Sequence, residues 1–151
     1  MSESTVDTNT ISVVFPEGSR RSYRSGVQAG EILKDGEFRG PSPIVAVRVN
    51  KALTSLTYRI DISSSIEPVF LASRTGSTIY RRSLCFLLTI AAKQLFPDRR
   101  LVIGHSLGRG YFYYLDGMPE VGPDDLQALR SRMKDIVAAD LPILRAVISY
   151  S

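Results

Sequence analysis

The sequence predicts an α+β fold of two consecutive modules, and three observations support that prediction. The chain has 151 residues, of which 44% are hydrophobic and 23% charged, as in a globular protein that can bury a core. In the first half, short runs rich in β-branched residues, such as 44–49, alternate with turn residues. In the second half, residues 78–96 contain no Gly or Pro, which favours one long helix.

The first module is predicted at 11–72, after a loose segment at 1–10. Residues 11–15 and 22–24 are expected to pair as a hairpin across the turn residues at 16–19. A short helix is expected at 27–34, a loop rich in Gly and Pro at 36–43, and a turn at 50–51. Further strands are expected at 44–49, 59–62 and 67–71. This order predicts a small mixed sheet with one helix across its face.

The second module is predicted at 73–151. Its long helix has cap residues at 75–77 and ends at Pro97, and its middle, including Leu84 and Phe86, is apolar enough to be buried on most sides. Strands at 101–103 and 111–115 are expected on either side of a glycine-rich loop at 104–110. A closing strand is expected at 146–150. A second helix begins at Pro123, and its predicted apolar face consists of Leu126, Leu129, Met133, Ile136 and Val137.

Basic residues are concentrated in one stretch of the chain. The net charge is +4, from 19 Lys and Arg against 15 Asp and Glu, and 15 of the basic residues are Arg. Residues 74–110 contain seven basic side chains and one acidic side chain, a local charge of +6. Arg suits two-point hydrogen bonding to phosphate. The stretch therefore favours an anionic partner, nucleic acid or nucleotide, while a solvated face with partly paired charges would have the same composition.

Several classes of site are excluded by the residues present. Residues 104–108 match the G-x-S-x-G of serine hydrolases, but the one histidine of the chain, His105, lies inside that motif, so no second histidine can activate Ser106. No G-x-x-x-x-G-K-[ST] is present to hold a triphosphate. One Cys and one His exclude the usual all-protein zinc cage, and no metal or cofactor is expected. The lone Cys85 fits a reducing cytoplasm, and no apolar run is long enough to span a membrane.

Segments spread over nearly the whole chain resemble two known domains in a fixed order. Residues 11–72 resemble a TGS domain, the ubiquitin-like β-grasp module of threonyl-tRNA synthetases, stringent-response enzymes and some GTPases. Residues 73–151 resemble the editing domain that follows TGS in threonyl-tRNA synthetases and is shared with alanyl-tRNA synthetases. The first resemblance rests on 14–19, 29–32, 45–50 and 53–58, and the second on 79–83, 87–88, 93–97, 110–114 and 124–133.

The chain departs from the editing domain at its catalytic motifs. The first H-x-x-x-H pair of that family aligns to Arg82 and Phe86, and the C-x-x-x-H pair would lie beyond Ser151. The resemblance therefore implies that this chain does not hydrolyse mischarged tRNA by the family's mechanism. Phe86 is expected to be a core residue, and Arg82 turns a catalytic position into one that suits an anion.

The same two modules, with a degenerate editing-like domain, occur in bacterial uridine kinase-like nucleoside kinases, where they precede a P-loop kinase domain. Residues 81–84 and 105–110 are similar to that family. This resemblance predicts an N-terminal accessory module that binds RNA or a nucleotide, is not an enzyme on its own, and works beside a downstream kinase domain or partner subunit.

The resulting site hypothesis is an anion-binding surface for RNA or a nucleotide, with no DNA or membrane partner. Two alternatives remain open: a threonyl-tRNA synthetase-like region that acts on aminoacyl-tRNA, and a purely structural interaction module. A hairpin with its tyrosines on alternate faces would also account for residues 111–114. The predicted contacts are Arg81, Arg82 and Arg109 to phosphate, His105 with Tyr111 or Tyr113 shaping a pocket, and Arg20, Arg21 and Arg24 extending the surface.

Overall fold

The computed structural model describes residues 9–108, 110–118, 120–143, 146 and 149. The chain divides into two compact units, residues 1–81 (unit 1) and 82–151 (unit 2). The division falls within helix α2 (Arg74–Leu95), nine residues after the boundary predicted at 72/73. Both units combine helices and strands, which confirms the predicted α+β class. The identity of each unit as a particular domain stays a prediction.

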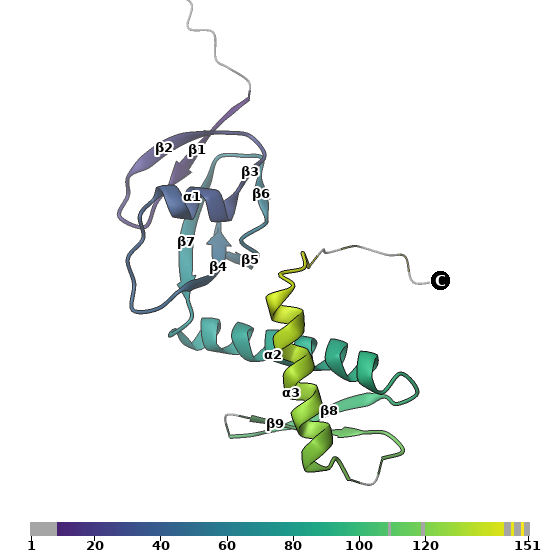
Figure 1. Cartoon of the computed structure of the whole chain (residues 1–151). Coiled ribbons are helices and arrows are strands. Elements are labelled where there is room, and N and C mark those ends of the chain that lie inside the picture. Colours follow the sequence, from purple (N-terminus) through teal and green to yellow (C-terminus); the bar gives the residue numbers. More distant parts are fainter. Residues whose placement is uncertain (1–8, 109, 119, 144–145, 147–148, 150–151) are drawn as a thin grey trace, which may run out of the picture. The chain divides into compact units, whose positions relative to one another are not determined.

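Unit 1 is built on a five-stranded mixed sheet crossed by one short helix. The strand order is β2-β1-β7-β4-β5, in which β1 and β7 are parallel and the other neighbours antiparallel. Helix α1 lies across one face of this sheet (Figure 1), as the predicted order of elements indicated. The elements are β1 (Thr10–Val14), β2 (Arg20–Arg24), β3 (Val27–Gln28), α1 (Ala29–Asp35), β4 (Ile44–Val49), β5 (Ala52–Thr54), β6 (Arg59–Ile60) and β7 (Ser64–Phe70).

The core of unit 1 follows from two periodicities in the sequence. In β1, alternation places Ile11 and Val13 on the face that meets α1. On α1, Ile32 and Leu33 point back at the sheet, and Ile32 is fully buried. Burial of each such side chain stabilises the fold by roughly 1.5–3 kcal/mol. The expected short helix is confirmed, but residues 27–28 form β3 and not its first turn.

Helix α2 begins earlier than expected because Ser73, and not residues 75–77, caps it. The Ser73 hydroxyl accepts a hydrogen bond of 3.0 Å from the backbone N–H of Gly76, the third residue of the helix, as N-cap serines do. A Cβ added at Gly76 would clash with the carbonyl oxygen of Phe70. Glycine is therefore required where the first turn of α2 passes the end of β7.

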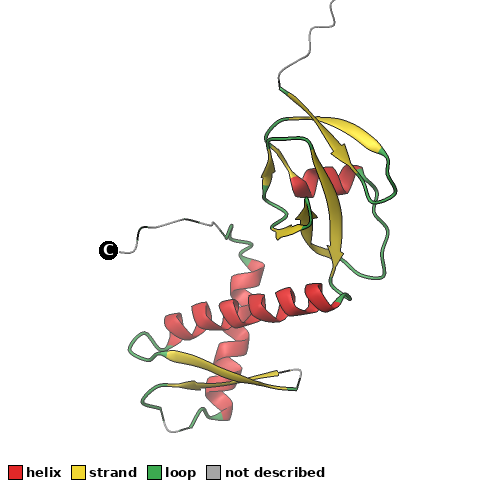
Figure 2. Cartoon of the chain, turned by 180° about the vertical axis from the view of Figure 1, so that it is seen from behind, coloured by secondary structure: helices red, strands yellow, loops and turns green. Residues whose placement is uncertain are grey.

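Unit 2 packs two helices against one side of an antiparallel hairpin. The hairpin is β8 (Leu101–Leu107) and β9 (Gly110–Leu115), and the second helix, α3 (Pro123–Ala138), crosses α2 (Figure 2). Its buried core consists of Ala91, Ala92, Leu115 and Leu129, with partly buried Leu88, Phe96, Leu101, Met118, Val121, Met133 and Ile136 around it.

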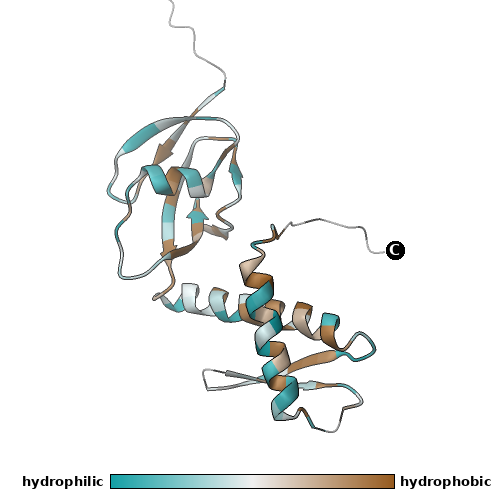
Figure 3. Cartoon of the chain, in the orientation of Figure 1, coloured by the Kyte–Doolittle hydropathy of each residue, from teal (hydrophilic) through white to brown (hydrophobic). Residues whose placement is uncertain are grey.

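The expectations for the 104–110 loop and for the middle of α2 are wrong. Residues 104–107 are not a loop but the second half of β8, and the turn is confined to the residues after Leu107, where Gly108 has a φ of +57°. The middle of α2 is hydrophobic, as Figure 3 shows, yet Leu84 is 39% and Phe86 51% exposed. Phe86 is therefore not a core residue, because only the Leu88 side of α2 meets the hairpin and α3.

Helix α3 begins at Pro123 as predicted, and Asp125 accepts a hydrogen bond of 3.0 Å from the backbone of Gly122 at its start. Leu129 is buried on its inner face, whereas Leu126 and Val137 are 44% and 63% exposed, so the predicted apolar face is too wide. The strand expected at 146–150 lies largely outside the described residues, which include Ala146 and Ser149.

Candidate nucleic-acid interface

The three arginines predicted on the first hairpin, Arg20, Arg21 and Arg24, divide between the two faces of strand β2. Arg21 lies on the face that carries α1, where its Nη1 donates to the Asp35 carbonyl oxygen at 2.8 Å and to Asp35 Oδ2 at 3.1 Å. Its guanidinium also lies 5.2 Å from the ring centre of Phe15. These contacts fix the Arg21 side chain against unit 1 although it is still 47% exposed, so it contributes to the structure of the hairpin.

Tyr23 completes a small polar cluster with Arg21 and Asp35. Its hydroxyl donates to Asp35 Oδ2 at 2.5 Å. This hydrogen bond and the one from Arg21 hold the pKa of the Asp35 carboxyl below its ordinary value. The pKa of Tyr23 is raised by burial and by the neighbouring carboxylate, and that of Arg21 is raised by its hydrogen bond to Asp35. The cluster therefore favours a charged Arg21–Asp35 pair.

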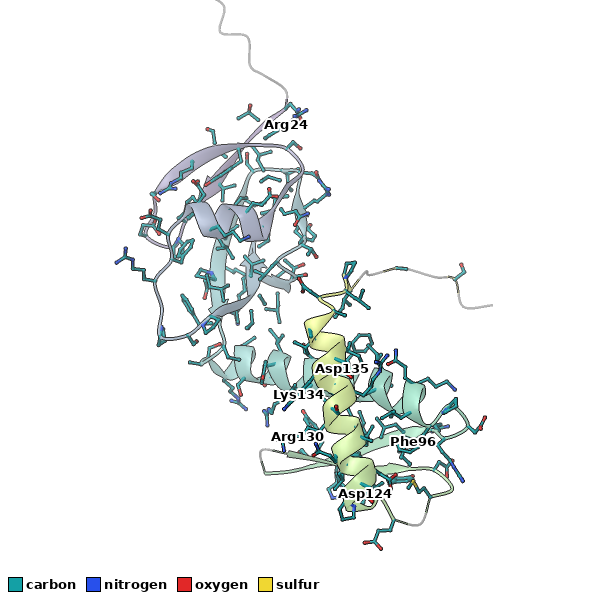
Figure 4. All side chains as sticks on the ribbon, viewed as in Figure 1. Arg24, Phe96, Asp124, Arg130, Lys134 and Asp135 are labelled. Atoms are coloured by element: carbon teal, nitrogen blue, oxygen red, sulfur yellow. The ribbon has the colours of Figure 1, made fainter. Side chains whose placement is uncertain are left out.

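Arg20 and Arg24 lie on the opposite face of β2 because side chains alternate along a strand. The register pairs Arg20 with Val14 and Arg24 with Thr10, and Ser12 pairs with Ser22 between them. Both arginines are exposed, and Figure 4 shows Arg24 at the end of unit 1 where β1 begins. This face presents guanidinium groups and small hydroxyl side chains, which suit phosphate contacts.

The two arginines predicted on α2 differ in exposure. Arg82 is exposed, whereas Arg81 is half-buried. Within the part of the chain that the structure describes, the Arg81 Nε is buried without a hydrogen-bond partner, which is uncommon in folded proteins. Arg82 and the exposed Phe86 lie one helical turn apart, so the two side chains share one exposed face of α2.

The hairpin of unit 2 separates the remaining predicted contacts. His105 is exposed and stacks on Phe112, with ring centres 6.0 Å apart and an interplanar angle of 21°. Tyr111 and Tyr113 are half-buried and alternate with Phe112 along β9, so they point to the other face. Arg109 lies outside the described residues. The structure thus brings His105 together with Phe112, and not with Tyr111 or Tyr113.

The contacts predicted from the sequence do not include several exposed residues of unit 2. Phe112 and Tyr114 are 48% and 44% exposed, and their rings are 6.3 Å apart. Alternation in the aromatic run 111–114 already predicts that two of the four rings face solvent. The structure shows that these two are Phe112 and Tyr114. Arg130 and Lys134 project from one side of α3 (Figure 4), and their spacing of four residues in the sequence already indicates a shared helical face.

Of the predicted contact residues, Arg24 lines a cavity of about 490 Å³ in unit 1, together with Asn9, Thr10, Ser22 and Tyr23. Among the described residues, no group of three or more His, Cys, Asp or Glu could hold a metal ion. A groove of about 870 Å³ lies in unit 1 beside α1 and the 37–44 segment, and Lys34, Phe38 and Arg39 line it. None of the predicted contact residues lines this groove. No helix in the described part of the chain is long and apolar enough to cross a membrane.

Comparison with known proteins finds threonine–tRNA ligases that are similar over both units. The chain is 30% identical over 139 residues to the threonine–tRNA ligase of Carboxydothermus hydrogenoformans, covering 92% of this chain and 22% of that protein. It is 32% identical over 142 residues to that of Streptomyces griseus, again over 92% of the chain. The chain spans about a fifth of the length of these curated relatives. No family model matches the chain.

These relatives correct the main functional expectation from the sequence. The predicted link to uridine kinase-like nucleoside kinases is wrong, because the similar proteins are threonine–tRNA ligases. With that link, the expected downstream kinase domain loses its support. The resemblance to the TGS and editing region of threonyl-tRNA synthetases is the interpretation that the relatives support.

Proposed function

We propose that this chain is a tRNA-binding module related to the N-terminal region of threonine–tRNA ligases, and that it does not hydrolyse aminoacyl-tRNA itself. The observation that carries the proposal is similarity over 92% of the chain, through both units, to proteins whose name states that they act on tRNA. The chain spans only 21–22% of those proteins, so the ligase reaction itself is not proposed for it.

The charge distribution supports an RNA ligand. The chain has a net charge of +4, and residues 74–110 contain seven basic side chains and one acidic side chain. Arg20, Arg24 and Arg82 are exposed on their elements. Exposed guanidinium groups form hydrogen bonds to phosphate oxygens, and the release of counterions from RNA then favours binding.

The residues at the editing positions support binding without catalysis. Arg82 and Phe86 stand where the editing family has its first histidine pair, and the chain contains one His and one Cys. A phenylalanine cannot bind a metal or take up a proton. An arginine stays protonated at neutral pH and cannot act as a general base, but it can hold a phosphate. A cytoplasmic location stays a prediction from the lone Cys85.

A binding measurement with two matched variants tests the proposal. Fluorescence anisotropy of labelled tRNA should show binding by the chain and weaker binding by the Arg82→Ala/Arg109→Ala variant. Arg21→Ala serves as the control, because Arg21 is already bonded to Asp35. Undiminished binding by the double variant would count against these arginines, and no binding by the unaltered chain at any salt concentration would favour the structural interaction module.

A second assay tests the absence of catalysis. The chain should leave mischarged aminoacyl-tRNA as intact as buffer does, since Arg82 and Phe86 replace the histidine pair. Deacylation is followed by the loss of acid-precipitable amino acid label. Turnover that depends on the concentration of the chain would contradict the non-catalytic part of the proposal and would support action on aminoacyl-tRNA by another route.

A further inference from the structure

Three aromatic rings form a row on the outer face of the β8–β9 hairpin. His105 stacks on Phe112 at 6.0 Å, and Phe112 lies 6.3 Å from Tyr114 at an interplanar angle of 42°. Phe112 and Tyr114 are 48% and 44% exposed, and His105 is exposed as well. The rings therefore support one another and still present much of their surface to solvent.

The register of the hairpin explains why the three rings share one face. Leu101 pairs with Leu115, and both belong to the side that packs on the helices. The next pair, Val102 and Tyr114, therefore faces away from the helices. The register then shifts between Ile103 and Ser106, so that two residues of β8 oppose one residue of β9. Such a bulge redirects side chains, and here His105 stacks on Phe112.

Exposed aromatic residues that occur singly are common on protein surfaces. A row of rings in mutual contact differs from such single residues. Each ring limits the side-chain rotation of the next, and the row presents several flat surfaces side by side. Sheet surfaces with rings of this kind stack the bases of single-stranded nucleic acid, and they do so with little dependence on sequence.

The charge near the hairpin fits an anionic partner. Residues 99–110 contain three arginines, Arg99, Arg100 and Arg109, and no acidic residue. Arg100 precedes β8 and is exposed. It lies two residues before Val102, so alternation places its side chain on the same outer face, beyond Tyr114. Its backbone pairs with Asp116, which provides one negative charge at that end. Arg99 is engaged at this end, since its Nη1 donates to the Gly117 carbonyl oxygen at 2.6 Å. Flat rings together with the exposed guanidinium of Arg100 suit a chain of bases and phosphates.

We propose that the outer face of the β8–β9 hairpin stacks the bases of a single-stranded segment of RNA, with His105, Phe112 and Tyr114 as the contact rings. This inference rests on the proposed tRNA-binding function and names the surface that holds unpaired nucleotides. Tyr111 and Tyr113 lie on the opposite face and contribute to the fold of the hairpin.

A tryptophan reporter tests stacking directly, because the chain contains no Trp. Phe112→Trp keeps a ring at the centre of the row, and bases that stack on it should quench its fluorescence. Tyr58→Trp is the matched control, since Tyr58 is 47% exposed in unit 1. Titration with single-stranded oligouridine should quench the tryptophan at 112 and leave that at 58 unchanged. Equal quenching at both positions, or at neither, would overturn the inference.

Removal of the rings provides the complementary test. Phe112→Thr and Tyr114→Thr retain β-propensity and should each weaken binding of the oligonucleotide by at least about fivefold, the effect of losing one stacked base. The dependence of binding on salt should stay unchanged, because the variants keep every arginine that can hold a phosphate. Tyr58→Thr should bind like the unaltered chain. Circular dichroism establishes that each variant is folded.

The outcomes separate this inference from the proposed function. If the chain binds tRNA and the ring variants bind tRNA and oligonucleotide undiminished, the stacking surface is overturned while tRNA binding stands. If the chain binds oligonucleotide through the rings but does not bind tRNA, the surface stands and the proposed function fails. Emission from Phe112→Trp that changes with protein concentration and not with RNA would mean that a second copy covers the face, which also overturns the inference.

Discussion

Units 1 and 2 bury their apolar residues to different extents. Ten buried residues form one cluster between the sheet and α1 in unit 1, whereas four form the core of unit 2. The large exposed hydrophobic residues show the reverse, since four of those described lie in unit 1 and ten in unit 2. Unit 1 thus uses its apolar side chains for its own stability, while unit 2 leaves many of them at the surface.

The core of unit 1 should be the more sensitive to truncation. Ile32→Ala removes a fully buried side chain and should lower the free energy of unfolding by about 2–5 kcal/mol. Urea denaturation followed by circular dichroism measures the loss, and hydrogen exchange assigns it to unit 1. Ile62→Ala is the control, because Ile62 is 70% exposed and its truncation should change stability by no more than about 0.5 kcal/mol. Equal losses for both would contradict the assigned core.

The core of unit 2 should respond less strongly. Leu115 is 1% exposed, but half-buried neighbours such as Leu101 and Met118 surround it and can relax into the space left by Leu115→Ala. The expected loss in the free energy of unfolding is about 2–3 kcal/mol, near the lower end of the range for such truncations. Leu141→Ala is the control, because Leu141 is exposed. A loss as large as that of Ile32→Ala would show that the two cores are equally tight.

The two faces of β2 should differ in binding. Arg20→Ala/Arg24→Ala should weaken tRNA binding, and the slope of affinity against salt should become shallower by about one for each phosphate that is no longer neutralised. Arg21→Ala should retain both the affinity and the salt dependence, because its guanidinium is engaged by Asp35 and Phe15. Anisotropy at several salt concentrations measures both quantities. A larger effect from Arg21 than from the other two would reverse the assignment of the faces.

The smallest expected effect is a dependence of unit 1 stability on acid pH. The pKa of Asp35 is lowered in the folded chain. The ionised Asp35 carboxylate therefore stabilises the fold at pH values above the ordinary carboxyl pKa of about 4. That contribution is lost as the pH falls through the lower folded value. Asp35→Asn should therefore reduce the fall in melting temperature below about pH 4. An unchanged acid profile in the variant would show that other carboxyl groups determine it.

Periodicity predicted most of the fold. The run 44–49 and the Gly-free stretch 78–96 correctly indicated β4 and α2, because each pattern extends over a whole element. Strand β5 was not predicted, since its three residues are too few to establish a period. The extent of β8 was missed because Gly104 in a sequence suggests a loop, whereas in the structure it lies beside the Phe112 ring.

The candidate site was less predictable than the fold. Composition predicted that arginines would contact an anionic partner. Which face of the sheet carries Arg20 and which carries Arg21 depends on the register of β2 against β1. Likewise, the aromatic run 111–114 contains two alternating pairs, and the position of β9 against the helices selects Phe112 and Tyr114 as the exposed pair. Neither choice can be made from a local pattern, since both depend on tertiary packing.

The most direct test of the proposed function is the affinity of the unaltered chain for labelled tRNA across a series of salt concentrations. We expect the logarithm of the binding constant to fall linearly with the logarithm of salt, with a slope of roughly −2 to −4 for a few neutralised phosphates. Binding that is absent at low salt, or that does not change with salt, would contradict the proposal that the exposed arginines hold an RNA backbone.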